Sequence, residues 1–180
     1  TPGRYGANCP SKPYAENLPR YIRITDINEQ GQLLQAKVSA DGDPSKWNNY
    51  YLEDGDILFA RTGATVGKTF LYKKEYGKCI YAGYLICFRI NKEIADPSYV
   101  FHFTKSPKYF SWINSSQRVV AQPNINAKQY SSLEIPLPPL NEQRRIAKIL
   151  DKIHQLKSLI NIIKNQSLTL KQSIYVERFG

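Results

Sequence analysis

Residues 141–174 read NEQRRIAKILDKIHQLKSLINIIKNQSLTLKQSI, and this stretch decides how the chain is organised. Its apolar residues recur at alternating steps of three and four positions, which is the a/d spacing of a coiled coil. The seam that they form consists of Ile146, Ile149, Ile153, Leu156, Ile160, Ile163, Leu170 and Ile174. Only Ser167 interrupts this seam, and neither Gly nor Pro occurs between Asn141 and Phe179. The pattern predicts one long helix whose apolar seam needs a partner helix.

The residues before this helix have a different pattern: short β-rich runs are separated by loops that contain Gly and Pro. We therefore predict an α+β fold: a mixed globular domain of many short strands over residues 1–140, followed by a long coiled-coil helix over residues 141–180. Asn141 is expected to cap the helix, with Glu142 in the first turn, where the helix dipole favours an anion.

Within the globular part, the run DILFA (Asp56–Ala60) predicts a buried strand. Residues 1–19 are expected to be a loop, residues 79–90 one strand and residues 133–136 a last strand. Asp96 and Asn126 are typical N-caps and predict helices that follow them.

Composition limits the classes of protein that the chain can belong to. At 42% apolar residues it can bury a core, and it has no run of 18 apolar residues that could span a membrane. Three cysteines without a close pair fit reduced thiols, and we expect a cytoplasmic protein. Cys79 and Cys87 lie in an apolar run without a nearby His, which favours packed thiols over metal ligands. The sequence lacks Met and begins with Thr, so residues upstream are expected to be missing.

The net charge of +10 is shared by both parts of the chain. Residues 1–140 hold 17 basic and 12 acidic residues, and residues 141–180 hold 8 and 3. Such a surface can simply confer solubility, but it is also typical of proteins that bind nucleic acid. The 13 tyrosines add rings that can stack on bases, although most of them are expected in the core.

The run GDILFARTGATVGKT (residues 55–69) looks like a phosphate-binding loop. That motif requires four residues between its first glycine and Gly-Lys-Thr, and a helix afterwards. Here only three residues follow Gly63, and the β-branched and aromatic residues after Lys68 predict a strand. We therefore expect a tight loop, shaped by Gly63 and Gly67, that exposes Arg61 and Lys68, and no nucleotide site.

Little in the sequence supports catalysis. The two histidines, His102 and His154, fit structural or solvated positions, and no motif for a methyl donor or a nuclease has the required spacing. We predict a binding module without catalytic residues, cofactor or metal. A self-standing nucleic-acid enzyme and a coiled-coil assembly protein that does not bind DNA remain as alternatives.

Three blocks of the sequence together resemble a known family. They are RYIRITDI near the start, LEDGDILFARTGATVGK in the middle, and QPNINAKQYSSLEIPLPPLNEQRRIAKIL, which leads into the helix. They resemble the DNA specificity subunits of type I restriction-modification enzymes, most strongly over residues 20–150. The chain has one recognition domain and one helix, where a full subunit has two of each.

The resemblance implies recognition of one half of a split double-stranded DNA site. It also implies partner modification and restriction subunits, which supply S-adenosylmethionine-dependent methylation and ATP-dependent cleavage. The second half of the assembly would come from a second copy of the chain or from the rest of a longer subunit.

DNA contacts are expected from polar residues in loops and turns, because loops can follow a groove and their cations neutralise phosphates. The residues predicted to bind DNA are Arg4, Tyr5, Lys12, Lys46, Arg61, Lys68, Lys73, Lys74, Arg118, Gln122 and Asn124.

The seam residues are expected to form a homodimer, with an antiparallel pair favoured because it places two domains at opposite ends of one rod. A helix of about 35 residues spans about 50 Å, close to fifteen base pairs, and can act as a spacer ruler. The alternative is that the helix folds back on its own domain.

Overall fold

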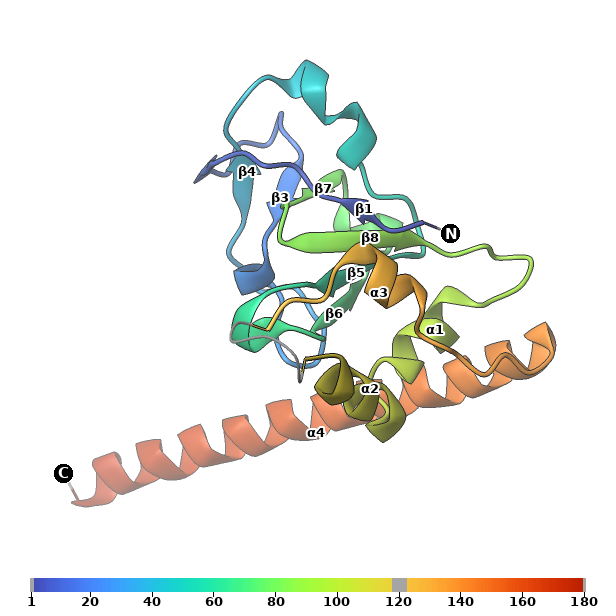
Figure 1. Cartoon of the computed structure of the whole chain (residues 1–180). Coiled ribbons are helices and arrows are strands. Elements are labelled where there is room, and N and C mark those ends of the chain that lie inside the picture. The colour runs from blue at the N-terminus through green and yellow to red at the C-terminus, as the bar shows by residue number, and fades with distance from the viewer. Residues whose placement is uncertain (1, 118–122, 180) are drawn as a thin grey trace.

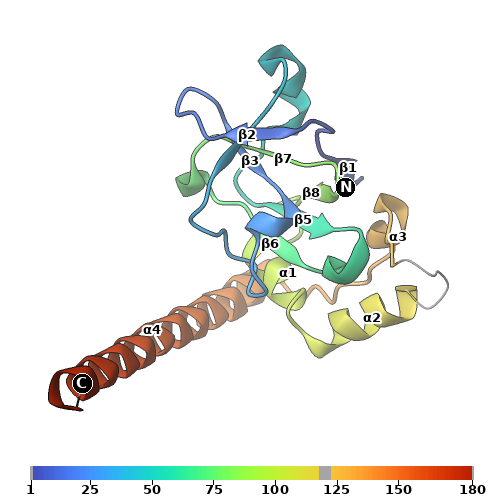
Figure 2. The same cartoon turned by 90° about the vertical axis from the view of Figure 1, so that its left-hand side faces the viewer.

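The computed structural model describes residues 2–117 and 123–179. A globular body of two small sheets and several short helices sits on one long helix, which extends beyond the body in both views (Figures 1 and 2). The predicted α+β architecture with a long C-terminal helix is confirmed.

The first sheet holds the predicted DILFA strand at its centre. Its order is β1 (Arg4–Tyr5), β8 (Leu85–Arg89), β5 (Asp56–Ala60) and β6 (Thr69–Leu71), and all neighbours are antiparallel. Every residue of β5 is buried, because both faces of the sheet are covered. A strand covered on both faces reads as a continuous apolar run, as DILFA does.

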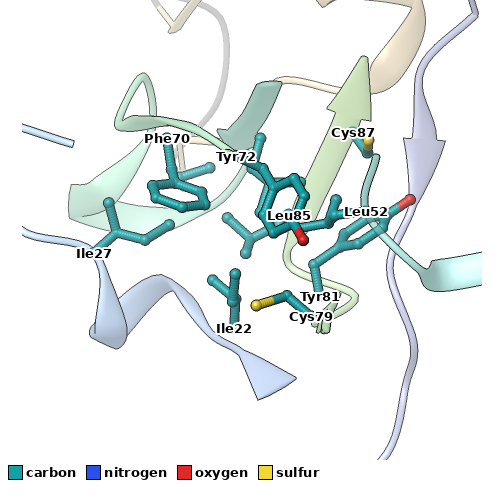
Figure 3. Packing of buried hydrophobic residues seen from close by; sticks show 11 residues of the cluster. Ile22, Ile27, Leu52, Phe70, Tyr72, Cys79, Tyr81, Leu85 and Cys87 are labelled. Atoms are coloured by element: carbon teal, nitrogen blue, oxygen red, sulfur yellow. The ribbon is translucent and has the colours of Figure 1, made fainter. Parts of the chain in front are cut away.

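The second sheet has the order β2 (Ser11–Pro13), β4 (Val38–Ala40), β3 (Arg20–Ile22) and β7 (Cys79–Tyr81), with β3 and β7 parallel. The main core cluster brings residues of both sheets together, as Figure 3 shows. Cys79 and Cys87 are buried in it, so the prediction of packed thiols is confirmed. Burial raises the pKa of the Cys79 thiol to about 11.

Short helices complete the body. The α-helices are α1 (Pro97–Phe103), α2 (Pro107–Gln117) and α3 (Ala127–Ser131), and the 3₁₀ turns are η1 (Ile24–Asp26), η2 (Pro44–Tyr50), η3 (Gly63–Thr65) and η4 (Lys74–Tyr76). Asp96 and Asn126 cap α1 and α3 through their side chains, as predicted. The three α-helices supply a second core cluster against the other face of β5.

Three of the expected elements are wrong. Residues 1–19 are not all loop, since they contain the short strands β1 and β2. The expected strand over residues 79–90 is interrupted by a turn, so that β7 joins one sheet and β8 the other. Residues 133–136 form no strand. Each error comes from pairing with distant residues, which local patterns do not encode.

The long helix, α4, runs from Leu140 to Phe179. It starts one residue earlier than expected, because the carbonyl of Pro139 already accepts from Glu142 N and Gln143 N. Asn141 therefore lies inside the first turn, and its predicted role as the N-cap is wrong. Glu142 is in the first turn as predicted, and it pairs with Arg145.

The first half of α4 docks on the body through a polar stripe. Gln143 is buried and makes three hydrogen bonds: it accepts from Asp96 N (2.9 Å) and donates to the carbonyls of Ile94 (3.1 Å) and Pro138 (2.8 Å). Asp151 hydrogen-bonds to His102 of α1 (2.7 Å). The four residues that hydrogen-bond to Gln143 and Asp151 all lie on the body, so these contacts fix where the helix leaves it.

The seam of α4 points away from the body. Ala147, in the docking stripe, is buried, whereas Ile149 and Ile153 are 47% and 42% exposed. Ala147 and Ile149 are two residues apart, which is about 200° around the helix axis at about 100° per residue. The alternative in which the helix folds back on its own domain holds for the first half of α4, which docks on the body, whereas Ile149 and Ile153 of the seam stay exposed.

We predict that Gln143→Leu lowers the free energy of unfolding by about 2–4 kcal/mol. A leucine of similar size leaves three buried backbone groups without their partners. Gln166→Leu, at an exposed position of the same helix, is the control and should change stability by less than about 0.5 kcal/mol. Urea unfolding followed by circular dichroism measures both variants. Equal stabilities would show that the amide does not hold the helix to the body.

Candidate nucleic-acid interface

The glycine-containing loop between β5 and β6 is a tight turn, as the sequence predicted. It forms the 3₁₀ turn η3, and strand β6 follows Lys68 where a phosphate-binding loop would begin a helix. Gly63 and Gly67 have φ values of +63° and +88°, which side chains other than glycine rarely adopt. A Cβ at Gly67 would also press on Ile113 of α2.

Two buried tyrosines hold this loop in place. Tyr130 donates to the carbonyl of Ala60 (2.7 Å) and accepts from Gly67 N (3.2 Å), while Tyr109 donates to the carbonyl of Gly67 (2.9 Å). Burial raises the pKa of both phenols, so they remain neutral donors. The loop is thus a rigid support for the side chains that it carries.

Three of the predicted DNA-binding residues meet at this loop. The guanidinium of Arg61 lies 4.7 Å from the centre of the Tyr5 ring, and the Tyr5 hydroxyl accepts from Ala127 N (3.1 Å). Asn124 is exposed and lies beside Thr62, because Ile125 N donates to the Arg61 carbonyl and Gly63 N to the Pro123 carbonyl. Residues far apart in sequence thus form one group, which we call the Arg61 cluster: Tyr5, Arg61 and Asn124.

Lys68 is not exposed as the sequence predicted. Its side chain is only 12% exposed, donates to the Ile27 carbonyl (3.2 Å) and pairs with Glu29 (2.9 Å). The expectation that the loop exposes Lys68 is wrong, because the strand that follows turns the side chain toward residues 27–29. Its charge has a carboxylate partner.

The other predicted cations lie apart from the Arg61 cluster. Lys12 is in β2 and pairs with Asp41 (3.3 Å), and Lys46 is exposed on η2. Lys73 and Lys74 are exposed at the opposite end of β6, where Lys74 N donates to Asp54. Arg118 and Gln122 lie outside the described residues. The structure therefore groups some of the predicted contacts and separates the rest.

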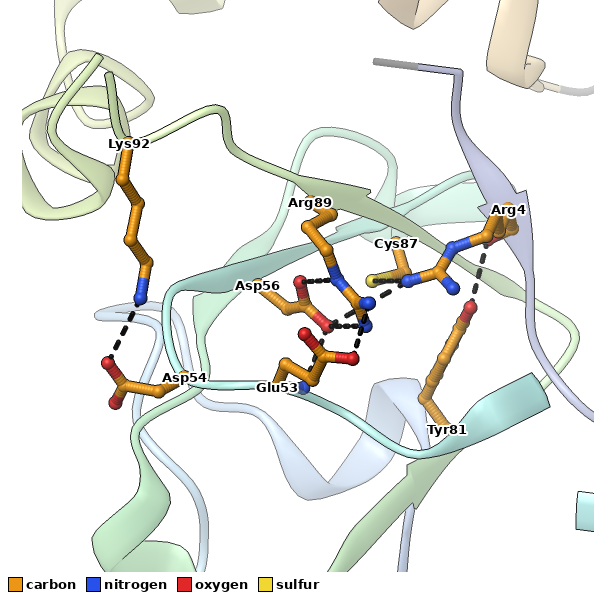
Figure 4. Close-up of polar contacts among 8 residues, drawn as sticks. All are labelled: Arg4, Glu53, Asp54, Asp56, Tyr81, Cys87, Arg89 and Lys92. Carbon is orange, nitrogen blue, oxygen red and sulfur yellow. Dashed lines mark hydrogen bonds and ion pairs between the residues drawn. The ribbon is translucent and has the colours of Figure 1, made fainter. Parts of the chain in front are cut away.

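Arg4 belongs to a network of charges at the edge of the first sheet (Figure 4). The buried carboxylate of Asp56 accepts from Nε and Nη2 of Arg89 (3.0 and 3.1 Å), and Arg4 Nη2 lies 3.9 Å from it. Glu53 pairs with the remaining end of Arg89. Both carboxylates surround Arg89, whose pKa is raised mainly by its hydrogen bonds to Asp56. This network holds β1, β5 and β8 together.

Sequence reasoning overlooked a second arginine–carboxylate pair, next to the Arg61 cluster. Asp26 is buried and accepts from Nε (3.1 Å), Nη2 (2.8 Å) and the backbone N (2.8 Å) of Arg23. The hydrogen bond to Asp26 raises the pKa of Arg23. The two residues are three apart in RITD, a spacing that could have indicated the pair.

Arg23 lines a pocket of about 270 Å³ between η1 and the turn that joins β7 to β8. Tyr84 of this turn also lines the pocket and is 64% exposed, and its carbonyl accepts from Arg61 N (3.2 Å). Tyr84 thus links the pocket that contains Arg23 to the backbone of Arg61.

The seam of α4 is a second candidate interface. Its exposed fractions are 59% for Leu156, 61% for Ile160, 56% for Ile163, 61% for Leu170 and 48% for Ile174, and Ile146 is partly buried. An exposed apolar stripe of this length is a typical protein-association surface. Across residues 2–117 and 123–179, no group of three or more metal-binding side chains gathers, and no helix is apolar enough over a sufficient length to cross a membrane.

Comparison with known families agrees with this geometry. The family model described as "Type I restriction modification DNA specificity domain" matches residues 10–170. The chain belongs to this family. The match covers most of the body, with Arg61 and Asn124 of the Arg61 cluster, and most of α4.

Members of the family with known names share parts of the chain. The MjaVIII specificity subunit of a type I restriction enzyme from Methanocaldococcus jannaschii is 30% identical over 133 residues, 71% of this chain and 30% of that protein. The EcoKI specificity subunit of Escherichia coli is 31% identical over 144 residues, 75% of this chain and 31% of that protein. This specificity domain therefore spans about a third of the length of these relatives.

A solved structure confirms the fold. The HsdS subunit from Thermoanaerobacter tengcongensis superimposes with a TM-score of 0.61 at 22% identity, over 96% of this chain and 46% of that one. The arrangement of body and helix is thus shared with a specificity subunit of about twice this length.

Lys105 makes the stability of this specificity domain depend on pH. Its ammonium group donates to Thr69 Oγ1 (3.0 Å) and lies 4.8 Å from the centre of the Phe101 ring. Desolvation lowers the pKa of Lys105 to about 8. The unfolded chain, with an ordinary lysine pKa near about 10.4, binds more protons between these values, so this residue makes stability rise with pH there.

We predict that, between pH 7.5 and 10, the free energy of unfolding of the wild type rises by about 1–2 kcal/mol relative to that of Lys105→Met. The full change in the pKa of Lys105 corresponds to a larger free-energy change, but the side chain is partly exposed and solvent screens its charge. Urea unfolding at several pH values measures the difference, with the exposed Lys128→Met as the control for loss of a charge. Parallel pH profiles for wild type and Lys105→Met would contradict the assigned pKa.

Proposed function

We propose that this chain recognises one half of a split double-stranded DNA site for a type I restriction-modification complex. The observation that carries this proposal is the Arg61 cluster on its pinned loop, in a chain of the DNA specificity family. A cation, an aromatic ring and an amide, carried on backbone segments that hydrogen bonds join, are groups that contact phosphates, sugars and base edges.

The chain acts by binding, and the chemistry comes from its partners. Modification subunits methylate the DNA and a restriction subunit cleaves it, as the resemblance implied. The buried tyrosines and the charge network support this division, because their polar groups are engaged within the body. If the chain were instead a self-standing nucleic-acid enzyme, the isolated chain with a suitable cofactor would convert nucleic acid to a product.

The helix α4 joins two recognition bodies through its seam. Two copies of this chain pair as a homodimer, or the chain pairs with the second half of a longer subunit. The exposed seam supports this pairing, since it lies opposite the docking stripe and can bind a second helix without leaving the body. The docking stripe can therefore hold the body while the seam pairs with a second helix.

An antiparallel pair is the arrangement that suits a split site. A two-fold axis through the rod places the two bodies at its opposite ends. The 40 residues of α4 span about 60 Å at about 1.5 Å per residue, so the rod is long enough to separate two half-sites. Helix length then sets the number of bases between them.

We predict that Arg61→Ala weakens DNA binding by the complex with modification subunits and reduces the salt slope by about one. Lys37→Ala is the control, because Lys37 also lies over a tyrosine, Tyr14, but away from the Arg61 cluster. Filter binding at several salt concentrations measures both. If none of the eight predicted cations affects binding when changed to Ala, the assignment of the DNA contacts is contradicted.

We predict that Ile153→Asp combined with Ile160→Asp converts the homodimer into monomers. Two carboxylates in the seam remove the apolar contacts that pair the helices. Gln155→Asp with Gln172→Asp adds the same charge at exposed positions about 100° or more around the helix from the adjacent seam residues, and this variant should remain dimeric. Sedimentation velocity distinguishes the species, and a monomeric wild-type chain would contradict pairing between two copies.

A further inference from the structure

Arg23 has hydrogen-bond donors that the protein does not use. A guanidinium carries five N–H donors. Nε and one hydrogen of Nη2 bind Asp26, and one hydrogen of Nη1 points to Ser11 Oγ at 3.3 Å. One donor therefore remains on each terminal nitrogen, and the side chain is 36% exposed.

The carboxylate of Asp26 fixes the direction of these donors. It binds the Nε/Nη2 edge in two parallel hydrogen bonds and is itself only 5% exposed. The hydrogen bond from the backbone N of Arg23 orients the same carboxylate. A buried partner that holds one edge of an arginine leaves the other edge preorganised for a ligand with two adjacent acceptors.

The contrast with Arg89 shows that this arrangement is not a general property of arginines in the chain. Arg89 gives the same edge to Asp56, but Glu53 occupies its other end. Arg23 has only a hydroxyl there, from Ser11, and that hydroxyl is at a long distance. Arg89 is a structural ion pair, whereas Arg23 faces a pocket.

The rest of the pocket is uncharged and mostly apolar, with a few polar side chains. Arg23 is the one charged residue among those that line it within the described residues, and its charge is offset by Asp26. Asn8 and Thr25 are exposed there, and in the described part of the chain no protein hydrogen bond reaches their side chains. A site for a lone anion would gather further cations. An uncharged lining that combines apolar surface with a few hydrogen-bonding groups suits a nucleobase better.

We propose that Arg23 contacts the target DNA through its two remaining donors, with Asp26 as the positioning residue. The ligand is a pair of adjacent acceptors, which guanine offers at O6 and N7 and a phosphate offers as two oxygens. The neutral lining favours guanine. This inference rests on the proposed function, because it assigns a further contact to the same DNA-binding surface.

The test uses the chain in complex with its modification subunits and a randomised double-stranded DNA library. We expect Arg23→Lys to bind the preferred sequence about 5- to 150-fold more weakly, because lysine keeps the charge but has no paired donors. Asp26→Asn should give a smaller loss, since the donors remain but lose their fixed direction. Asn8→Ala, which removes an exposed group without touching the ion pair, should also weaken binding.

Arg145→Lys is the matched control, because Arg145 forms the same two-bond pair with Glu142 but on α4 and outside the pocket. Thermal unfolding of every variant separates loss of fold from loss of contact. A loss confined to sequences with one particular guanine supports base reading. A uniform loss, with a salt slope that falls by about one in Arg23→Ala but not in the charge-conserving Arg23→Lys, supports the contact and assigns it to a phosphate.

Unchanged binding and sequence preference for Arg23→Lys and Asn8→Ala, in folded variants, would overturn the inference while leaving the proposed function intact. A wild-type complex without salt-dependent DNA binding would overturn both.

Discussion

Helix α4 has two faces that one body cannot bury together. The stripe with Gln143 and Ala147 is buried against the body, and most of the seam lies on the far side of the helix, with Ile149 about 200° around the axis from Ala147. The docking contacts are hydrogen bonds, which fix direction, whereas the seam is aliphatic, which supplies association energy. Body position and helix pairing are thereby assigned to different residues. The proposed role as a spacer depends on this separation.

Three arginines of the body show how a carboxylate neighbour decides what a guanidinium can do. Arg89 is surrounded by Asp56 and Glu53, so it holds strands together. Arg61 has no carboxylate partner in the described structure and lies over the Tyr5 ring. Arg23 lies between these cases, with one edge bound to a carboxylate and the other end met only by the Ser11 hydroxyl. The net positive charge therefore says little about DNA contact until each cation's partners are known.

The sequence predicted those parts of the structure that rest on local patterns. The seam spacing predicted the helix, DILFA predicted the central strand, and Asp96 and Asn126 predicted two caps. It failed where distant residues decide. Strands β1 and β2 have two and three residues and exist only through their pairing with β8 and β4.

The candidate site divides in the same way. Tyr5, Arg61 and Asn124 were predicted as separate loop residues, and only the fold brings them together. Lys68 was placed wrongly because its partner, Glu29, lies far away in sequence. The pair of Arg23 and Asp26 was within reach of sequence reasoning, since both residues stand three apart in one short turn.

The central claim is that the body reads a half-site and that α4 measures the distance to the next one. Insertion of one heptad into the seam between Ile163 and Leu170, followed by methylome sequencing of cells that carry the chain with its modification subunit, tests it most directly. A heptad preserves the seam and lengthens the helix by about 10 Å, or about three base pairs. We predict a longer spacer between two unchanged half-sites. Altered half-sites with an unchanged spacer would contradict the account.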